Sequence, residues 1–276
     1  MQRQGNYRKL VDKYGKITIA AIDHRGSLKK SLRPGDPGSV TEDEILAWKK
    51  RLVNLYKEEV SGILIDPIYG KTVIDLQAPC GWMLSMEKTG YRGEQQARET
   101  ELLPNWTVRQ ARELGAVGVK LLLYYDPQNV KLAARQRGIA QTVANDCKRE
   151  GMVFLLEPLS YSKTGMDKPD VVLETAKELA YLDVDIFKFE YPGDEVSCAK
   201  ITEIVKKPWV LLSAGMEYNA YELALKSAMV GGASGFAVGR AVWQEFGNYQ
   251  GEEREKYFTD VALPRMRKLI KVVQNI

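Results

Sequence analysis

Hydrophobic and polar residues alternate along the chain in eight repeats of one pattern. Each repeat opens with a short, mostly unbroken apolar run and continues with apolar residues at helical spacing. Unbroken apolar runs are typical of parallel strands that helices cover. The strands predicted in this way span residues 17–23, 62–66, 82–86, 117–124, 152–157, 185–190, 209–213 and 234–238.

Helix signals separate these strands. Thr41 to Glu44 has the form of a capping box that opens a helix, and Gly115 and Gly151 stand where glycines end helices. We predict helices at residues 41–59, 69–77, 107–114, 129–150, 169–182, 195–206 and 219–230, a helical segment after Gly239-Arg240, and an amphipathic C-terminal helix at 252–276. Residues 1–14 form a polar segment without a predicted element, and residues 33–39 and 92–101 are expected to be loops.

Eight βα units in 276 residues predict an α/β protein, a single (β/α)8 TIM barrel that spans residues 1–276 as one domain. The alternative is a doubly wound open sheet, which needs a glycine-rich fingerprint after its first strand. Asp23-His24-Arg25-Gly26 does not have that form. No linker divides the repeats, which favours the barrel.

The amino-acid composition restricts the classes of binding partner that we expect. A hydrophobic fraction of 45% with 28% charged residues is that of a globular protein, and a net charge of +4 does not argue for nucleic acid. Cys80, Cys147 and Cys198 are widely spaced, which indicates reduced thiols. Met1 to Lys13 lacks an apolar leader, and no apolar run is long enough to cross a bilayer. We expect a cytoplasmic protein with neither a nucleic-acid nor a membrane partner.

His24 is the single histidine of the chain. Metal sites with two or three imidazoles therefore need more than one chain, and a Ser-His-Asp triad would have to use His24. Lysines and carboxylates are the remaining tools for catalysis. We expect neither a metal nor another cofactor.

Polar residues gather where the predicted strands end, which is the face that carries the active site in a barrel. They are Asp23, Asp66, Glu87, Lys88, Lys120, Glu157, Lys188, Glu190, Ser213 and Arg240. Asp66 and Asp126 precede prolines and are better explained as turn residues. The joint pattern predicts one polar rim.

Lys188 lies in the middle of the apolar run at 185–190. Strand alternation places it on the opposite face from Phe187 and Phe189. A lysine in a packed sheet is either paired, for instance with Glu190, or used as a Schiff-base nucleophile. If Lys120 and Glu157 also face inward, two ammonium groups and a carboxylate meet in one pocket. A neighbouring cation and desolvation both lower the pKa of an amine, and Glu157 would then move protons.

A second signal follows the last two strands. Ser213-Ala214-Gly215 and the glycine-rich run from Gly231 to Arg240 flank the position where barrels bind phosphate. Glycines allow backbone N–H groups to approach a phosphate, and an arginine binds two of its oxygens. The alternative is a tight turn. A lysine nucleophile with a phosphate site predicts carbonyl chemistry on a phosphorylated sugar.

Four segments resemble the tagatose 1,6-bisphosphate aldolase family of class I, Schiff-base aldolases. They are Glu87-Lys88-Thr89-Gly90-Tyr91, Lys120 to Asp126, Lys188-Phe189-Glu190 and Leu212-Ser213-Ala214-Gly215, in order over roughly residues 15–245. Asp23-His24-Arg25-Gly26 resembles that family's Asp-Gln-Arg motif, with His24 in place of the usual glutamine. The segment from Pro208 through Trp243 is also similar to the related sulfofructose-phosphate aldolases.

The resemblance implies a role for each candidate residue. Lys188 would form the Schiff base, Glu157 would be the acid and base, Lys120 its polar neighbour, and Asp23 with His24 would face the substrate. Ser213, Gly215, Gly239 and Arg240 would bind the phosphate of dihydroxyacetone phosphate. The connection after residue 190 is shorter than in the tagatose enzymes, which bears on the second phosphate.

The predicted function is a metal-independent aldolase that cleaves a ketose phosphate to dihydroxyacetone phosphate and an aldehyde. One alternative is a sulfofructose-1-phosphate aldolase that releases sulfolactaldehyde, and another is a non-catalytic barrel that binds a phosphosugar. A barrel isomerase has less support, because the chain has no His–Glu pair suited to enediol chemistry. By analogy with other aldolase barrels, we expect a homo-oligomer.

Overall fold

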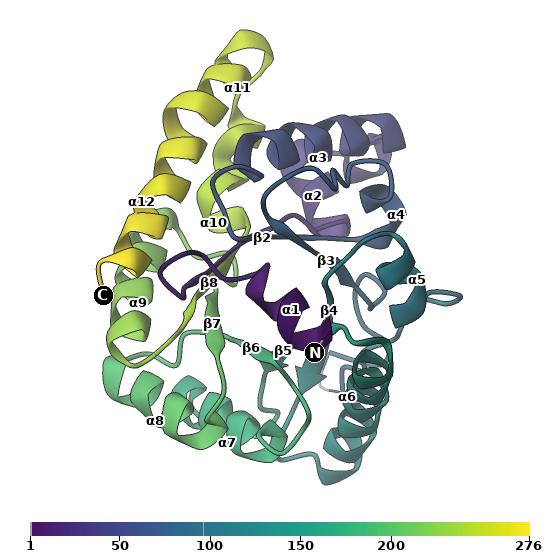
Figure 1. The fold of residues 1–276 in the computed structure, drawn as a ribbon, viewed down its shortest axis with the longest axis vertical. Coiled ribbons are helices and arrows are strands. Elements are labelled where there is room, and N and C mark those ends of the chain that lie inside the picture. The colour runs from purple at the N-terminus through teal and green to yellow at the C-terminus, as the bar shows by residue number, and fades with distance from the viewer. Residues whose placement is uncertain (1, 96) are drawn as a thin grey trace.

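The structure, a computed structural model, describes residues 2–95 and 97–276. Eight parallel strands close into a barrel in the order of the sequence, and helices surround it (Figure 1). The strands are β1 (Ile17–Ala21), β2 (Gly62–Ile65), β3 (Gly81–Ser85), β4 (Gly118–Tyr125), β5 (Val153–Ser160), β6 (Ile186–Phe189), β7 (Trp209–Leu212) and β8 (Gly235–Val238). The predicted TIM barrel is confirmed.

The helices lie between the strands and at both ends of the chain. They are α1 (Gln2–Arg8), α2 (Gly26–Leu32), α3 (Glu42–Tyr56), α4 (Pro67–Gly70), α5 (Val108–Glu113), α6 (Val130–Glu150), α7 (Lys168–Leu179), α8 (Glu195–Val205), α9 (Tyr218–Val230), α10 (Arg240–Trp243), α11 (Gly251–Tyr257) and α12 (Leu263–Gln274). Short 3-10 segments cover Pro37–Ser39 and Gln244–Asn248, and a π-helical turn covers Phe258–Ala262 between α11 and α12. No helix in the described ranges is both long and apolar enough to cross a membrane.

Side-chain alternation along the strands divides the core into two layers. The apolar side chains inside the barrel include Ile19, Leu64, Leu155 and Ile186. Leu10, which precedes β1, belongs to the same cluster. The other strand face packs against the helices in a larger cluster. The inner layer is apolar near the amino ends of the strands, and the polar residues lie toward their carboxyl ends.

The barrel closes where β8 meets β1, with Ile17 in register with Gly235. A Cβ atom at Gly235 would lie 1.8 Å from the Ile17 carbonyl oxygen, and the φ of Gly235 is +148°. An L side chain fits neither the space nor this backbone conformation. Gly235 therefore permits the close approach of the two strands that ends the sheet.

The predicted end of the fifth strand at Glu157 is wrong, because β5 continues through Pro158 to Ser160. The N–H groups of Val153 and Tyr161 donate to β4, at Val117 O and Tyr125 O. Backbone N–H groups alternate between the two neighbouring strands, so the nitrogen of Pro158 points toward β6. The pairing of β5 with β6 involves only Leu155 and Leu156 of β5, so it does not reach Pro158. The missing N–H of Pro158 thus costs no hydrogen bond to a neighbouring strand.

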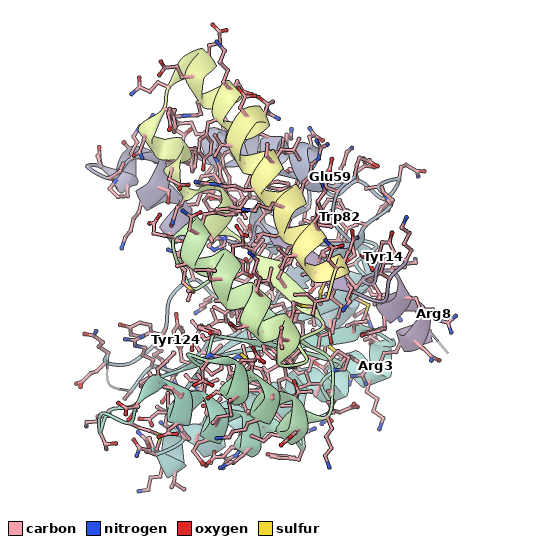
Figure 2. All side chains as sticks on the ribbon, turned by 90° about the vertical axis from the view of Figure 1, so that its left-hand side faces the viewer. Arg3, Arg8, Tyr14, Glu59, Trp82 and Tyr124 are labelled. Carbon is pink, nitrogen blue, oxygen red and sulfur yellow. The ribbon has the colours of Figure 1, made fainter. Side chains whose placement is uncertain are left out.

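Two helices, α1 and α2, were not predicted. Helix α1 lies in the polar N-terminal segment, where no apolar periodicity marks it, and tertiary contacts hold it. The Arg3 guanidinium lies 3.0 Å from Asp183 Oδ2 and 2.6 Å from Asp185 Oδ2. Figure 2 shows Arg3 and Arg8 on the side of the molecule opposite Tyr124, which belongs to the carboxyl half of β4. Helix α1 therefore lies at the amino end of the barrel.

The predicted C-terminal helix is present in two parts, α11 and α12, joined by the π-helical turn. Met266, Leu269 and Val273 are buried within the chain. Arg267 forms an ion pair with Glu59 at 2.6 Å. The C-terminal helix thus packs on the rest of the chain.

Candidate active site

The carboxyl ends of the strands surround a cavity of about 460 Å³, a volume typical of small-molecule sites. Residues from β1 and from β3 to β8, and from the loops after them, line the cavity. The residues to which the resemblance assigns a role all line it: Lys188, Glu157, Lys120, Asp23, His24, Ser213, Gly215, Gly239 and Arg240. Asp66, which the predicted polar rim also included, does not. The residues with an assigned role therefore share one cavity.

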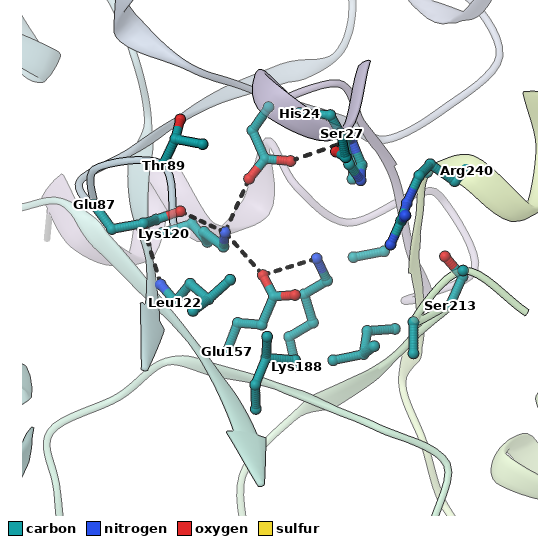
Figure 3. A pocket seen from close by; sticks show the side chains of 18 of the residues that line it. His24, Ser27, Glu87, Thr89, Lys120, Leu122, Glu157, Lys188, Ser213 and Arg240 are labelled. Carbon is teal, nitrogen blue, oxygen red and sulfur yellow. Dashed lines mark hydrogen bonds and ion pairs between the residues drawn. The ribbon is translucent and has the colours of Figure 1, made fainter. Parts of the chain in front are cut away.

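Strand alternation puts the three central side chains into this cavity. Lys188 has the same parity as Ile186, and Glu157 has the same parity as Leu155. Ile186 and Leu155 both belong to the apolar layer inside the barrel. Lys120, Glu157 and Lys188 are thus the next inward-facing residues above that layer, as the sequence predicted (Figure 3).

Lys120 lies among three carboxylates. Its Nζ is 2.9 Å from Asp23 Oδ2, 2.7 Å from Glu87 Oε1 and 2.9 Å from Glu157 Oε2. Burial by itself would lower the pKa of Lys120, but the negative charges of Asp23, Glu157 and Glu87 outweigh it and raise that pKa well above its ordinary value. All three N–H donors have acceptors, so Lys120 is a fixed cation rather than a nucleophile.

Lys188 has fewer partners than Lys120. Its Nζ is 3.0 Å from Glu157 Oε2, the same oxygen that contacts Lys120. The side chain is almost fully buried and its amine borders the cavity. Glu190, the partner considered from sequence, instead pairs with Lys168 at 2.6 Å. One shared carboxylate thus connects a fixed cation with a second amine.

The carboxylates of the cluster are held in their charged form. Burial opposes ionisation of Glu157, but the ammonium groups of Lys120 and Lys188 outweigh burial and lower its pKa. Burial likewise opposes ionisation of Asp23, and Lys120, His24 and Lys188 together lower its pKa far below the ordinary range. Glu157 is therefore an anion that can accept a proton from a neighbouring amine.

His24 is a buried, neutral imidazole beside Asp23. Burial lowers the pKa of His24 to about 4; Asp23 opposes this shift, and the cations of Arg240, Lys188 and Lys49 add to it. Its Nδ1 is 3.9 Å from Asp23 Oδ1 and has no hydrogen-bond partner among the described residues. The ring packs edge-on against Trp243 with centroids 5.4 Å apart. The neutral ring thus lines the cavity without an internal hydrogen bond at Nδ1.

Arg240, Ser213 and two glycines form another wall of the cavity, on the opposite side of Lys188 from Glu87 in Figure 3. No ion pair of Arg240 occurs within residues 2–95 and 97–276, and its Nε is buried without a partner there. A Cβ at Gly215 would lie 3.2 Å from Arg240 Nη2, and one at Gly239 would lie 2.5 Å from His24 Cε1. The glycines keep the space around Arg240 and His24 open.

The sequence pattern places Glu87 in the polar rim without assigning it a role, and it does not single out Arg25. Glu87 Oε2 accepts a hydrogen bond from the Leu122 N–H at 3.1 Å while its Oε1 contacts Lys120. Arg25 donates to the Glu87 carbonyl at 2.6 Å. Glu87 did carry a signal, as a carboxylate directly after a strand. Its pairing with Lys120 required the register of β3 and β4, in which Ser85 lies beside Lys120.

Within the described ranges, no three His, Cys, Asp or Glu side chains are placed to hold a metal ion. The carboxylates of the site surround Lys120 instead. Catalysis without a metal ion remains a prediction, and activity in the presence of a chelator tests it.

Barrels of this kind carry their active sites at the carboxyl ends of the strands, where this chain places two lysines and a carboxylate. Residues 17–245 match the sequence model of a family described as DeoC/LacD family aldolase. The chain therefore belongs to the DeoC/LacD family of class I aldolases, which are aldehyde-lyases.

Relatives of known name agree with this assignment. Tagatose 1,6-diphosphate aldolase 1 of Enterococcus faecalis is 31% identical over 277 residues, covering 88% of this chain and 85% of the relative. Tagatose 1,6-diphosphate aldolase of Lactococcus lactis is 29% identical with the same coverage. The crystal structure of an archaeal fructose 1,6-bisphosphate aldolase has the same fold, with a TM-score of 0.74 at 20% identity over 99% of this chain and 100% of that one.

Proposed function

We propose that this chain cleaves a phosphorylated ketose of the tagatose or fructose 1,6-bisphosphate type to dihydroxyacetone phosphate and an aldehyde. The observation that carries the proposal is the contact of Lys188 with Glu157 next to the fixed cation Lys120. The names of the relatives from Enterococcus faecalis and Lactococcus lactis support a ketose bisphosphate as substrate.

In the first step, Lys188 passes a proton to Glu157 and its neutral amine attacks the C2 carbonyl of the ketose. Glu157 then returns the proton to the oxygen of the carbinolamine and carries a second proton from the nitrogen to the same oxygen, so that water leaves and an iminium forms on Lys188. The positive charge of Lys120 remains 2.9 Å from Glu157 throughout and holds the proton-accepting carboxylate beside Lys188.

In the second step, the iminium accepts the electron pair of the C3–C4 bond. A base removes the proton of the C4 hydroxyl, the C3–C4 bond breaks, and the aldehyde is released while an enamine remains on Lys188. Glu157 is the acid and base for these transfers, and Asp23 with His24 orients the hydroxyl groups. Protonation of C3 and hydrolysis of the iminium release dihydroxyacetone phosphate.

The phosphate of the dihydroxyacetone half would bind at Ser213, Gly215, Gly239 and Arg240. Arg240 supports this role because it lines the cavity and has no carboxylate partner among the described residues. A guanidinium without an internal partner suits a doubly charged anion. The other end of the substrate would face Lys88 and Thr89, which line the cavity on the side of Glu87.

The decisive experiment treats the protein with dihydroxyacetone phosphate and sodium borohydride and maps the modified peptide by mass spectrometry. We expect the reduced adduct on Lys188, no adduct in Lys188→Met, and unchanged turnover in EDTA. An adduct elsewhere, or turnover that EDTA abolishes, would contradict the mechanism.

A substrate panel separates the remaining alternatives. Ketose bisphosphates and sulfofructose 1-phosphate share the dihydroxyacetone phosphate half and differ at the distal end. We expect faster cleavage of a bisphosphate, whereas preference for the sulfosugar would identify the sulfofructose-phosphate aldolase. A non-catalytic barrel would bind the sugars with equal affinity before and after Lys188→Met and would turn over none of them.

A further inference from the structure

A second fully buried lysine lies outside the cavity. Lys49 on α3 and Asp66 at the end of β2 both have side chains with 0% exposure, and Lys49 Nζ is 2.6 Å from Asp66 Oδ2. Neither residue lines the cavity. Removing two charges from water is costly, and a well-packed apolar pair is often at least as stable as a buried ion pair. Stability alone is therefore a weak explanation for this pair.

The contacts of Lys49 are directed at one short stretch of backbone. Its Nζ donates to the carbonyl of Ile22 at 2.5 Å and to the carbonyl of His24 at 2.9 Å. With Asp66, these acceptors account for all three N–H donors of the ammonium. The two carbonyls flank Asp23, whose carboxylate contacts Lys120 in the cavity.

The same stretch has little other support. Strand β1 ends at Ala21, and the Ile22 N–H makes the last contact to β2, at Leu64 O. The Ile22 and His24 carbonyls lie beyond the ladder and need another donor. Asp66 is in turn fixed, because its Oδ1 accepts from the N–H groups of Ile68 and Tyr69 at the start of α4.

We propose that Lys49, held by Asp66, is a positioning residue that sets the backbone of residues 22–24 so that Asp23 and His24 face the substrate. The part of this inference that concerns activity rests on the proposed aldolase function. Lys49 contacts neither Lys188 nor the cavity, so it acts on catalysis only through Asp23 and His24.

The principal test is the double variant Lys49→Met/Asp66→Asn. Met replaces the length of Lys49, and Asn leaves no unpaired charge and still caps α4. We expect a folded protein whose melting temperature is lower by several degrees, because two buried carbonyls lose their donor. We also expect kcat lower by about 10- to 100-fold and retained borohydride trapping on Lys188. Wild-type kcat in a folded double variant would overturn the inference.

The single histidine provides a readout that does not depend on activity. We expect the Hε1 resonance of His24 to shift in the double variant, because its carbonyl loses the Lys49 donor. Lys57→Met is the matched control: Lys57 follows α3 and forms a surface ion pair with Asp75 at 2.7 Å. Lys57→Met should leave both kcat and the resonance unchanged. An unmoved resonance in the double variant would also overturn the inference.

Asp66→Asn alone covers the case in which the double variant does not fold. A neutral amine still has two N–H donors, enough for both carbonyls, so we expect kcat within about threefold of the wild type. A larger loss in a folded Asp66→Asn would contradict the role of the carbonyl contacts. Failure of the aldolase proposal is distinguishable, because the wild type would then give no adduct on Lys188 while the His24 resonance test would stand.

Discussion

At the scale of single residues, the site assigns different tasks to two lysines of similar burial. Lys120 is 2% exposed and Lys188 is 5% exposed, but Lys120 has three carboxylate partners and Lys188 shares one of them. The number of fixed acceptors, rather than burial, distinguishes the two lysines. Glu157 is the residue through which the two act on each other.

His24 is predicted to stay neutral throughout the neutral pH range. Because burial lowers its pKa to about 4, its Hε1 resonance should be flat between about pH 8 and 5 and move only below that. A neutral imidazole offers one donor and one acceptor, as an amide does. His24→Gln should therefore keep kcat/KM within about tenfold, whereas His24→Ala should lose more.

Steady-state kinetics and an NMR titration of this single histidine check both statements. Titration near the ordinary value of 6.5 would contradict the first, and equal losses in the Gln and Ala variants would contradict the second. The lowered pKa of His24 also determines how its contribution to stability depends on pH. The unfolded chain takes up the proton first, so the contribution of His24 is present above pH 6.5 and is lost as the pH falls toward 4.

At the scale of elements, close backbone approaches decide where strands can run. β5 passes through Pro158 because its nitrogen needs no strand partner, and β8 reaches β1 because Gly235 has no side chain. The start of a helix can depend on local sequence alone. Helix α3 begins at the capping box of Thr41 and Glu44, as the sequence predicted.

Gly235→Ala should strongly destabilise the protein. The added Cβ would lie 1.8 Å from the Ile17 carbonyl at a φ of +148°, so β1 and β8 must separate, and we expect a loss of about 3 kcal/mol or more in the free energy of unfolding. Gly138→Ala in α6 is the control, because nothing lies within 4 Å of its added Cβ. It should stabilise by about 0.5–1 kcal/mol. Urea denaturation of both variants measures the difference, and similar effects would refute the closure argument.

At the scale of the whole molecule, the ion cluster ties the mouth of the barrel together. Lys120 on β4 contacts carboxylates that follow β1 and β3 and one within β5. Helix α1 lies at the opposite end of the barrel, and α12 packs along its side (Figure 1). Single-domain behaviour, homo-oligomer formation and cytoplasmic location remain predictions.

Lys120→Met should change how stability depends on pH. The lowered pKa values of Asp23 and Glu157 contribute stability above their unfolded values of 3.8 and 4.5, and this contribution is lost as the pH falls through the lower folded values. Without Lys120 the carboxylates lose their main cation. We expect a cost of about 3–5 kcal/mol at neutral pH that shrinks as the pH falls below 4.5.

Urea denaturation between about pH 7 and 3.5 gives the two curves. Lys177→Met, at an exposed ion pair with Glu174, is the control and should parallel the wild type. A constant difference between wild type and Lys120→Met over the whole range would contradict the role assigned to the cluster.

Much of the protein was predictable from sequence because it depends on local pattern. Unbroken apolar runs marked all eight strands. Parity along the runs allowed Lys120, Glu157 and Lys188 to meet if all three face inward, and in the closed barrel all three line the cavity. The carboxyl ends of parallel strands share one edge, so the candidate residues had to gather there. The family followed from motifs at those same ends.

Only the tertiary structure decided which charged groups touch. Glu87 joined the site through the register of β3 against β4, and Glu190 turned to Lys168 instead of Lys188. Lys49 carried no signal, because a lysine on a helix is usually exposed, and its burial depends on where α3 lies against β1 and β2. Sequence periodicity determines which face a residue takes; the distances between charges arise only when the barrel closes and brings separate strands within a few ångströms.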